Sequence, residues 1–121
     1  MSDFTRLELA VLRSIFVETP QYADGLAAQL AGASVAEREN TGGGFFTTIS
    51  VATAIPRVSS PRVLGHEIYA SVEGLADGMG FVLFMEDGYL NLLEGYAFGY
   101  ENTDLLDLTS VKFTISHSPN D

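Results

Sequence analysis

The spacing of apolar residues near the start of the chain predicts an amphipathic helix. Recurrence at steps of three and four residues places one apolar stripe on a helical face. The stripe consists of Phe4, Leu7, Val11, Leu12, Ile15 and Phe16. Thr5 followed by Glu8 fits a capping box at the start of this helix, with Ser2 or Asp3 as the alternative cap.

A second, shorter helix is expected after the Thr19-Pro20 pair. Thr19 can cap this helix with Pro20 at its first position, because the first turn does not use the amide hydrogen that proline lacks. Gly32 is the predicted end of the helix. Its apolar face would carry Tyr22, Leu26 and Leu30.

From Ser34 onward the pattern alternates with a period of two, which is typical of β-strands. Residues 34–40 are polar on both sides and predict an edge strand, whose charges discourage pairing with other chains. Further strands are expected in three stretches, 45–53, 66–73 and 111–116. The stretch 55–65 contains prolines and serines and is expected to form an irregular loop.

The strongest single pattern is a β-hairpin between Gly80 and Gly99, with Asp87-Gly88 as its two-residue turn. Asp-Gly favours a type I′ turn because both turn positions need a positive φ. Regular pairing from this turn matches Glu86 with Tyr89, Met85 with Leu90, Leu83 with Leu92 and Phe81 with Glu94, and alternates these pairs with Phe84–Asn91 and Val82–Leu93. Both faces are largely apolar, which predicts a central pair of strands.

Two helices followed by about six strands predict an α+β fold, with the helices on one face of a mainly antiparallel sheet. The length of 121 residues is typical of one domain, 1–121. Two short helices can cover only one side of such a sheet. The other side must meet the 55–65 loop, the 100–110 segment or another molecule, such as a second copy of the chain in a homodimer.

The charge of the chain is strongly negative and unevenly distributed. Residues 61–121 contain ten acidic residues against two basic ones, Arg62 and Lys112, and so carry −8 of the net charge of −10. Such a surface repels nucleic acid and anionic membranes, and neither is an expected partner. The acidic surface either serves solubility or docks a protein partner with a basic surface.

The sequence predicts a cytoplasmic location and a fold without disulfides. The N-terminal residues lack the basic and long apolar regions of a secretory signal. No apolar run has the length of a membrane helix. The chain contains no cysteine, so its stability must come from burial of its core.

Glu94 is the first candidate for a functional side chain. The predicted register places it on the same face as Phe81 and Leu83, where loss of solvation would raise its pKa. It would act there as a general acid or base in a pocket, or as a carboxylate satisfied by hydrogen bonds in a core. Tyr96, two residues away, shares its face, and with Tyr69 or His66 the pair could form an acid–base set. Tyr100 is a further expected neighbour of Glu94.

The sequence predicts no cofactor and no metal site. Two histidines without cysteine do not make a zinc site. The spacing from Asp87 to Glu94 matches the later half of a calcium loop, but Leu83 and Met85 would occupy its first and third ligand positions and cannot coordinate the ion. The glycines 42–44 precede a strand and predict a corner rather than a phosphate cradle. A cluster of acidic residues either gathers a divalent ion weakly or faces water: Glu101, Asp104, Asp107, Asp77, Glu86 and Asp87.

Three stretches together carry a resemblance: GGFFTTISV, GFVLFMEDG and LEGYAFGYEN. In this order, behind an amphipathic helix and the polar VAEREN strand, the chain resembles a family of small uncharacterised bacterial proteins. The resemblance covers about two thirds of the chain and implies a bacterial, cytoplasmic origin, with LEGY structurally central. Its members end the hairpin with Trp-Pro, where this chain has Asn102-Thr103. The family implies no activity.

Two classes of function follow from these patterns, and a homodimer without further biochemical role is a third outcome. The first is a non-enzymatic protein-binding or regulatory domain that uses its acidic surface or the uncovered sheet face, as an immunity protein neutralises a basic partner. The second is a small enzyme or ligand-binding protein with a pocket around Glu94. A cavity at that carboxylate distinguishes the second from the first.

Overall fold

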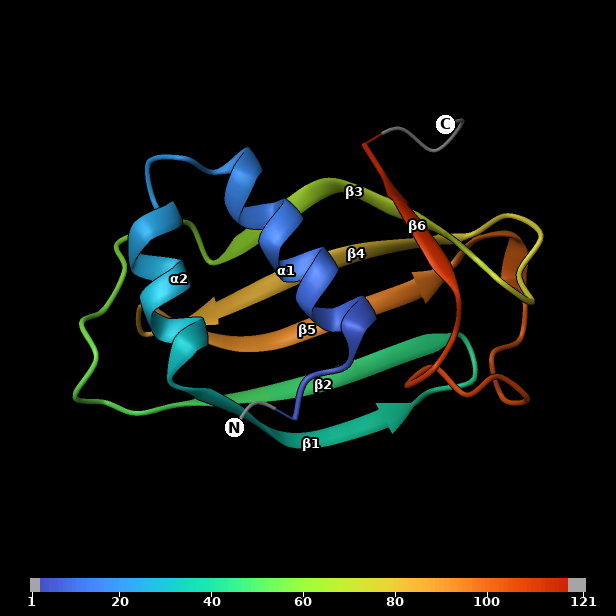
Figure 1. Ribbon diagram of the computed structural model, residues 1–121, viewed down its shortest axis with the longest axis horizontal. Helices are drawn as coiled ribbons and strands as arrows, with labels where there is room; N and C mark the ends of the chain where they lie inside the picture. The colour runs from blue at the N-terminus through green and yellow to red at the C-terminus, as the bar shows by residue number, and fades with distance from the viewer. Residues whose placement is uncertain (1–2, 118–121) are drawn as a thin grey trace.

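The computed structural model describes residues 3–117, apart from the side chain of His66. It has the predicted α+β fold, with two N-terminal helices followed by the strands of one sheet (Figure 1). The elements are α1 (Arg6–Glu18), α2 (Ala23–Ala31), β1 (Ala33–Asn40), β2 (Gly44–Val51), β3 (Val63–Val72), β4 (Met79–Glu86), β5 (Tyr89–Ala97), the short 3₁₀ helix η1 (Phe98–Tyr100) and β6 (Phe113–Ser116).

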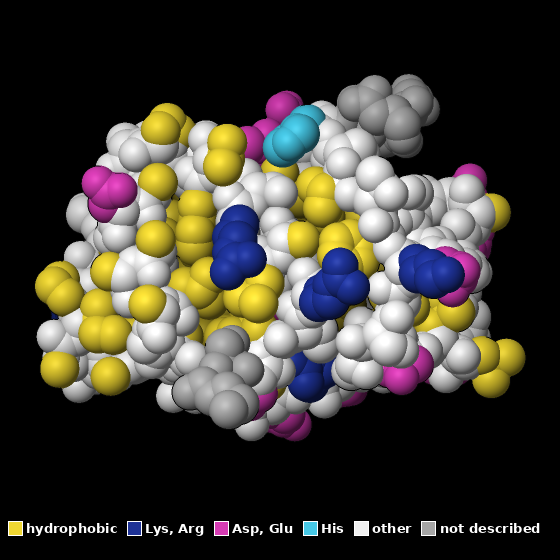
Figure 2. Space-filling view, viewed as in Figure 1, with side chains coloured by type: hydrophobic (Ala, Val, Ile, Leu, Met, Phe, Trp, Pro, Cys, Tyr) yellow, Lys and Arg dark blue, Asp and Glu magenta, His cyan; other side chains and the backbone are white. Residues whose placement is uncertain are grey.

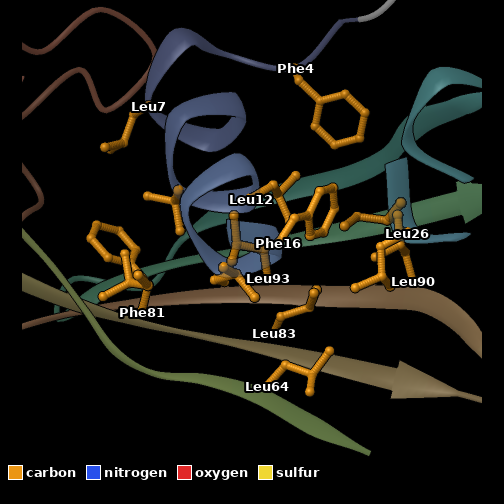
Figure 3. Close-up of a cluster of buried hydrophobic side chains, with 14 of the residues drawn as sticks. Phe4, Leu7, Leu12, Phe16, Leu26, Leu64, Phe81, Leu83, Leu90 and Leu93 are labelled. Atoms are coloured by element: carbon orange, nitrogen blue, oxygen red, sulfur yellow. The ribbon is translucent and has the colours of Figure 1, made fainter. Parts of the chain in front are cut away.

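The sheet is antiparallel throughout, and its six strands follow the order β1-β2-β5-β4-β3-β6. Both helices lie on the same face of it (Figure 1). The core fills the space between helices and sheet, as Figure 3 shows for Leu12 and Phe16 above Leu83 and Leu93. We call the opposite face of the sheet the outer face.

The start of α1 is as predicted, whereas α2 begins later than expected. Thr5 and Glu8 form the capping box, and Asp3 instead accepts a hydrogen bond from the amide of Val35; the alternative cap Ser2 lies outside the described residues. Thr19 does not cap α2. Its hydroxyl donates to the carbonyl of Ile15 and so ends α1, while α2 starts only after Tyr22.

The end of α2 is as expected and the strand boundaries match the prediction within two residues, except for the start of β3. Gly32 ends α2, and β1 is an edge strand. β3 begins at Val63, inside the stretch expected to be a loop, because Val63 and Leu64 pair with Phe84 and Leu83. A bulge then follows around Gly65, whose φ of +87° suits glycine.

The two segments that could have covered the outer face pack elsewhere. Val58, from the 55–65 stretch, is buried beside Gly25 of α2. Leu106 and Leu108, from the 100–110 stretch, pack against the core and border a cavity with Leu7 of α1. Leu105 is fully exposed. Both segments therefore extend the layer on the helix side.

Candidate functional site

The hairpin has the predicted turn but not the predicted register. Asp87 and Gly88 have φ values of 53° and 83°, as a type I′ turn requires. Beyond the Met85–Leu90 pair the register shifts, and β5 contains one extra residue, Asn91. From there each β5 residue is displaced by one, so that Glu94 pairs with Val82 rather than with Phe81, and the predicted register is wrong.

The bulge has a clear physical cause. It allows both Leu90 and Leu93 to point into the core, where each is almost fully buried. It also turns Glu94 to the outer face, which avoids the high cost of burying an unpaired carboxylate among apolar side chains. A residue that sequence reasoning missed supports the distorted strand: buried Gln29 of α2 accepts a hydrogen bond of 2.9 Å from the amide of Leu90 and donates one of 2.8 Å to the carbonyl of Gly88.

The structure brings three of the predicted site residues to the outer face. Glu94 is half-buried there, and Tyr96 and Tyr69 share the face because both flank Gly80 in the register. The ring of Tyr96 lies directly over Gly80, where a side-chain carbon would come within 2.6 Å of it. Tyr100 is fully exposed. The His66 side chain lies outside the described residues.

The surroundings of Tyr96 disfavour the ionised form of its hydroxyl. Burial raises the pKa of its hydroxyl, and Tyr69 and the negative charge of Glu94 raise it further. The phenol is therefore neutral at physiological pH, the form in which its hydroxyl can donate a hydrogen bond. Its ring also meets Phe98 edge-on at 5.5 Å, so it acts as part of an aromatic cluster.

The outer face combines half-exposed apolar side chains with carboxylates. Phe46 and Tyr96 are 37% and 36% exposed. The apolar side chains of this face come from four strands: Phe46 of β2, Val63 and Tyr69 of β3, Val82 and Phe84 of β4, and Leu92 and Tyr96 of β5. Glu39 pairs with Phe46 on one side and Glu94 pairs with it on the other. Glu37 faces the same way, opposite Thr48.

The basic residues lie on the helix side or at the sheet's ends. The six strands contain one Lys or Arg, Arg38, and its guanidinium binds Glu8 of α1. Arg6 and Arg13 are exposed on α1 itself, and Figure 2 shows basic side chains spread across the middle of the helix-covered side. Arg62 borders a hollow with Phe84 and Leu92, close to the Asp87-Gly88 turn. Elsewhere on the outer face, the described strands contribute carboxylates but no Lys or Arg side chain.

Part of the predicted acidic cluster gathers at the end of the sheet away from the hairpin turn. The carboxylate of Glu101 accepts a hydrogen bond of 2.9 Å from the amide of Ala76, which joins two loops. Asp104 lies beside Gly42, in the β1–β2 turn, and Asp77 lies beside Gly99. Two loops, the β3–β4 loop and the segment between η1 and β6, therefore present carboxylates at one end of the sheet.

The other members of that cluster do not join this group. Glu86 and Asp87 lie at the hairpin turn, at the opposite end of β4. Asp107 accepts hydrogen bonds from Thr109 and Ser110, which lower the pKa of its carboxyl. Within residues 3–117 no group of three or more His, Asp or Glu side chains is arranged to hold a metal ion.

A buried ion pair between Glu8 and Arg38 lies beneath α1. Glu8 is 2% exposed, and Arg38 donates to both of its carboxylate oxygens, at 2.7 and 2.8 Å. The amide of Thr5 donates to Oε1 at 2.8 Å, and the hydroxyl of Thr47 donates to Oε2 at 2.5 Å. Sequence reasoning identified the cap but not its burial. The one available signal was an acid adjoining the apolar stripe of α1 at Leu7 and Val11.

The ion pair joins α1 to β1, and its carboxylate is not a proton donor at neutral pH. Burial by itself raises the pKa of Glu8, but the hydrogen bonds from Arg38, Thr47 and Thr5 and the charge of Arg38 outweigh it, so the pKa is lowered. The carboxylate is ionised and fully hydrogen-bonded at neutral pH. A cavity of about 380 Å³ adjoins it, bordered by Asn40 and by the 106–109 segment.

No protein-family model, curated protein or solved structure matches this chain. Neither helix in the described part of the chain has the length and apolar composition needed to cross a membrane. The class of the protein is thus defined by its own structure. It is an α+β domain whose antiparallel sheet has one face covered by helices and one face of half-exposed aromatic and acidic side chains.

Proposed function

We propose that this chain is a non-enzymatic, cytoplasmic binding domain that recognises a protein partner with a basic surface. The observation that carries the proposal is the separation of charge. Arg38 is the single Lys or Arg of the described strands, and it forms an ion pair with Glu8 on the helix side of the sheet. Glu37, Glu39 and Glu94 project from the outer face. A surface of this kind attracts cationic partners over distances of about a Debye length, roughly 8 to 10 Å at physiological salt.

The alternative of an enzyme or ligand-binding protein built around Glu94 has less support. Glu94 projects from the outer face between Phe46 and Val82. The cavity of about 380 Å³ lies on the other side of the sheet, beside Glu8. An acid–base set needs its groups to converge on an enclosed space, and the register places Glu94 and Tyr96 on an open surface instead.

Binding of a fluorescent nona-arginine peptide tests the proposal. We expect saturable binding in about 50 mM NaCl, weakened about tenfold at about 300 mM, because the attraction is screened. A nona-glutamate peptide is the control and should not bind. Failure of nona-arginine to bind at the lower salt concentration, or binding that salt leaves unchanged, would contradict the proposed function.

A further inference from the structure

We propose that the outer face is where the basic partner docks, and that it takes an arginine-rich segment whose guanidinium groups stack on Phe46 and Tyr96 beside the carboxylates of Glu39 and Glu94. The inference rests on the proposed function and adds to it a location and a residue preference. Three observations support it: the strand register, the exposure of the rings and the sign of the charge.

The register places Phe46 between two carboxylates. Glu39 of β1, Phe46 of β2 and Glu94 of β5 are paired in one row across three neighbouring strands. Directly paired side chains have their Cβ atoms about 5 Å apart. A guanidinium group stacked on the Phe46 ring is therefore within reach of a carboxylate on either side.

The rings are available for stacking. Phe46 and Tyr96 are each more than a third exposed, although both belong to strands in the interior of the sheet. Tyr96 is held in place by Gly80 beneath it and by the ring of Phe98. The neighbouring half-buried side chains, Val82 and Leu92, offer apolar contact to the methylene groups of a long basic side chain.

The charge selects a cationic partner over a second copy of the chain. Two outer faces placed together would bring the carboxylates of Glu37, Glu39 and Glu94 from both copies into one interface. Like charges brought together in an interface oppose association. The chain as a whole, at a net charge of −10, adds to this repulsion.

Aromatic rings between carboxylates favour arginine over lysine. The guanidinium group is planar, stacks on ring faces and is more weakly hydrated than an ammonium group. It can also donate two hydrogen bonds to one carboxylate. We therefore expect nona-arginine to bind about fivefold more tightly than nona-lysine at the same salt concentration.

Two charge-matched double variants locate the site. Glu39→Gln with Glu94→Gln removes two charges from the outer face, and Asp77→Asn with Asp104→Asn removes two from the loop end. We expect the first to weaken nona-arginine binding about tenfold and the second by less than about twofold.

Phe46→Leu keeps an apolar side chain and should reduce the preference for arginine over lysine to near unity. Far-UV circular dichroism verifies that each variant is folded.

The outcomes separate the two proposals. If the unaltered chain does not bind nona-arginine, the proposed function itself fails. If it binds but the two double variants weaken binding equally, the attraction is spread over the whole surface and the outer face is not the site. Loss of binding in the loop variant alone assigns the site to the loops. An unchanged arginine preference in Phe46→Leu overturns the stacking. If light scattering detects dimers of the unaltered chain and the dimers bind nona-arginine more weakly than the monomer does, a second copy covers the outer face and the proposed partner is wrong.

Discussion

At the scale of single residues, the sequence predicts the helix-capping role of Glu8 but not its buried ion pair with Arg38. The spacing of Thr5 and Glu8 predicts a capping box, and the structure contains it. The same spacing says nothing of Arg38, which lies thirty residues further along and contacts Glu8 only after β1 has folded beneath α1. Burial of the carboxylate is a tertiary effect, and only the placement of the acid next to an apolar stripe indicated it.

Glu8 also gives the protein a definite pH dependence. Because its folded-state pKa lies below the ordinary value of 4.5, its contribution to stability is fully present above about pH 4.5 and is lost as the pH falls through the lowered folded-state value. Glu8→Gln should reduce the free energy of unfolding at pH 7 by about 2 kcal/mol, since the variant leaves Arg38 without its ionic partner.

Urea unfolding of the protein and of Glu8→Gln between about pH 6 and pH 3 measures this effect. The variant should lose less stability than the parent as the solution is acidified. The same change at the exposed Glu73 is the control and should leave the pH profile of the parent intact. Identical acid slopes for the parent and Glu8→Gln would show that Glu8 does not contribute in this way.

At the scale of elements, the sequence predicts the position and turn type of the β4–β5 hairpin correctly but not its register. Asp-Gly is a local signal, and local chemistry decides the turn. The bulge at Asn91 depends on interactions across the fold: the core takes Leu90 and Leu93, and Gln29 of α2 binds the amide of Leu90. Alternation alone could not reveal it, because both faces of the hairpin are apolar.

Substitutions in the turn test its geometry. Gly88→Ala should destabilise the protein by about 1 to 3 kcal/mol, because φ is +83° and the new Cβ would lie 2.8 Å from the Cβ of Arg57. Asp87→Asn is the matched control and should change stability by less than about 0.5 kcal/mol, since asparagine also adopts a positive φ. Equal urea midpoints for Gly88→Ala and the parent would contradict the turn geometry.

At the scale of the whole molecule, the periodicity of the sequence predicts the fold class and the order of helices and strands, which the structure confirms. The candidate site was harder to predict. The excess of acidic residues is visible in composition, but composition assigns it to the second half of the chain. The structure instead places Glu37 and Glu39, from the first half, on the same face as Glu94, because β1 and β5 flank the same strand.

This arrangement makes the two sides of the sheet chemically different. The helix side carries the basic residues of α1, and the outer face carries carboxylates around half-exposed rings. Such asymmetry orients a charged partner before contact. The central claim is therefore that basic segments bind the outer face rather than the acidic loops or the helices.

Titration of the ¹⁵N-labelled protein with nona-arginine, followed by two-dimensional NMR, tests that claim most directly. We expect the largest chemical-shift changes on β2 and β5, at Phe46, Glu94 and Tyr96, while the amide signals of α1 and α2 remain unchanged. Largest changes in the loop residues 101–107, or on the helices, would contradict it.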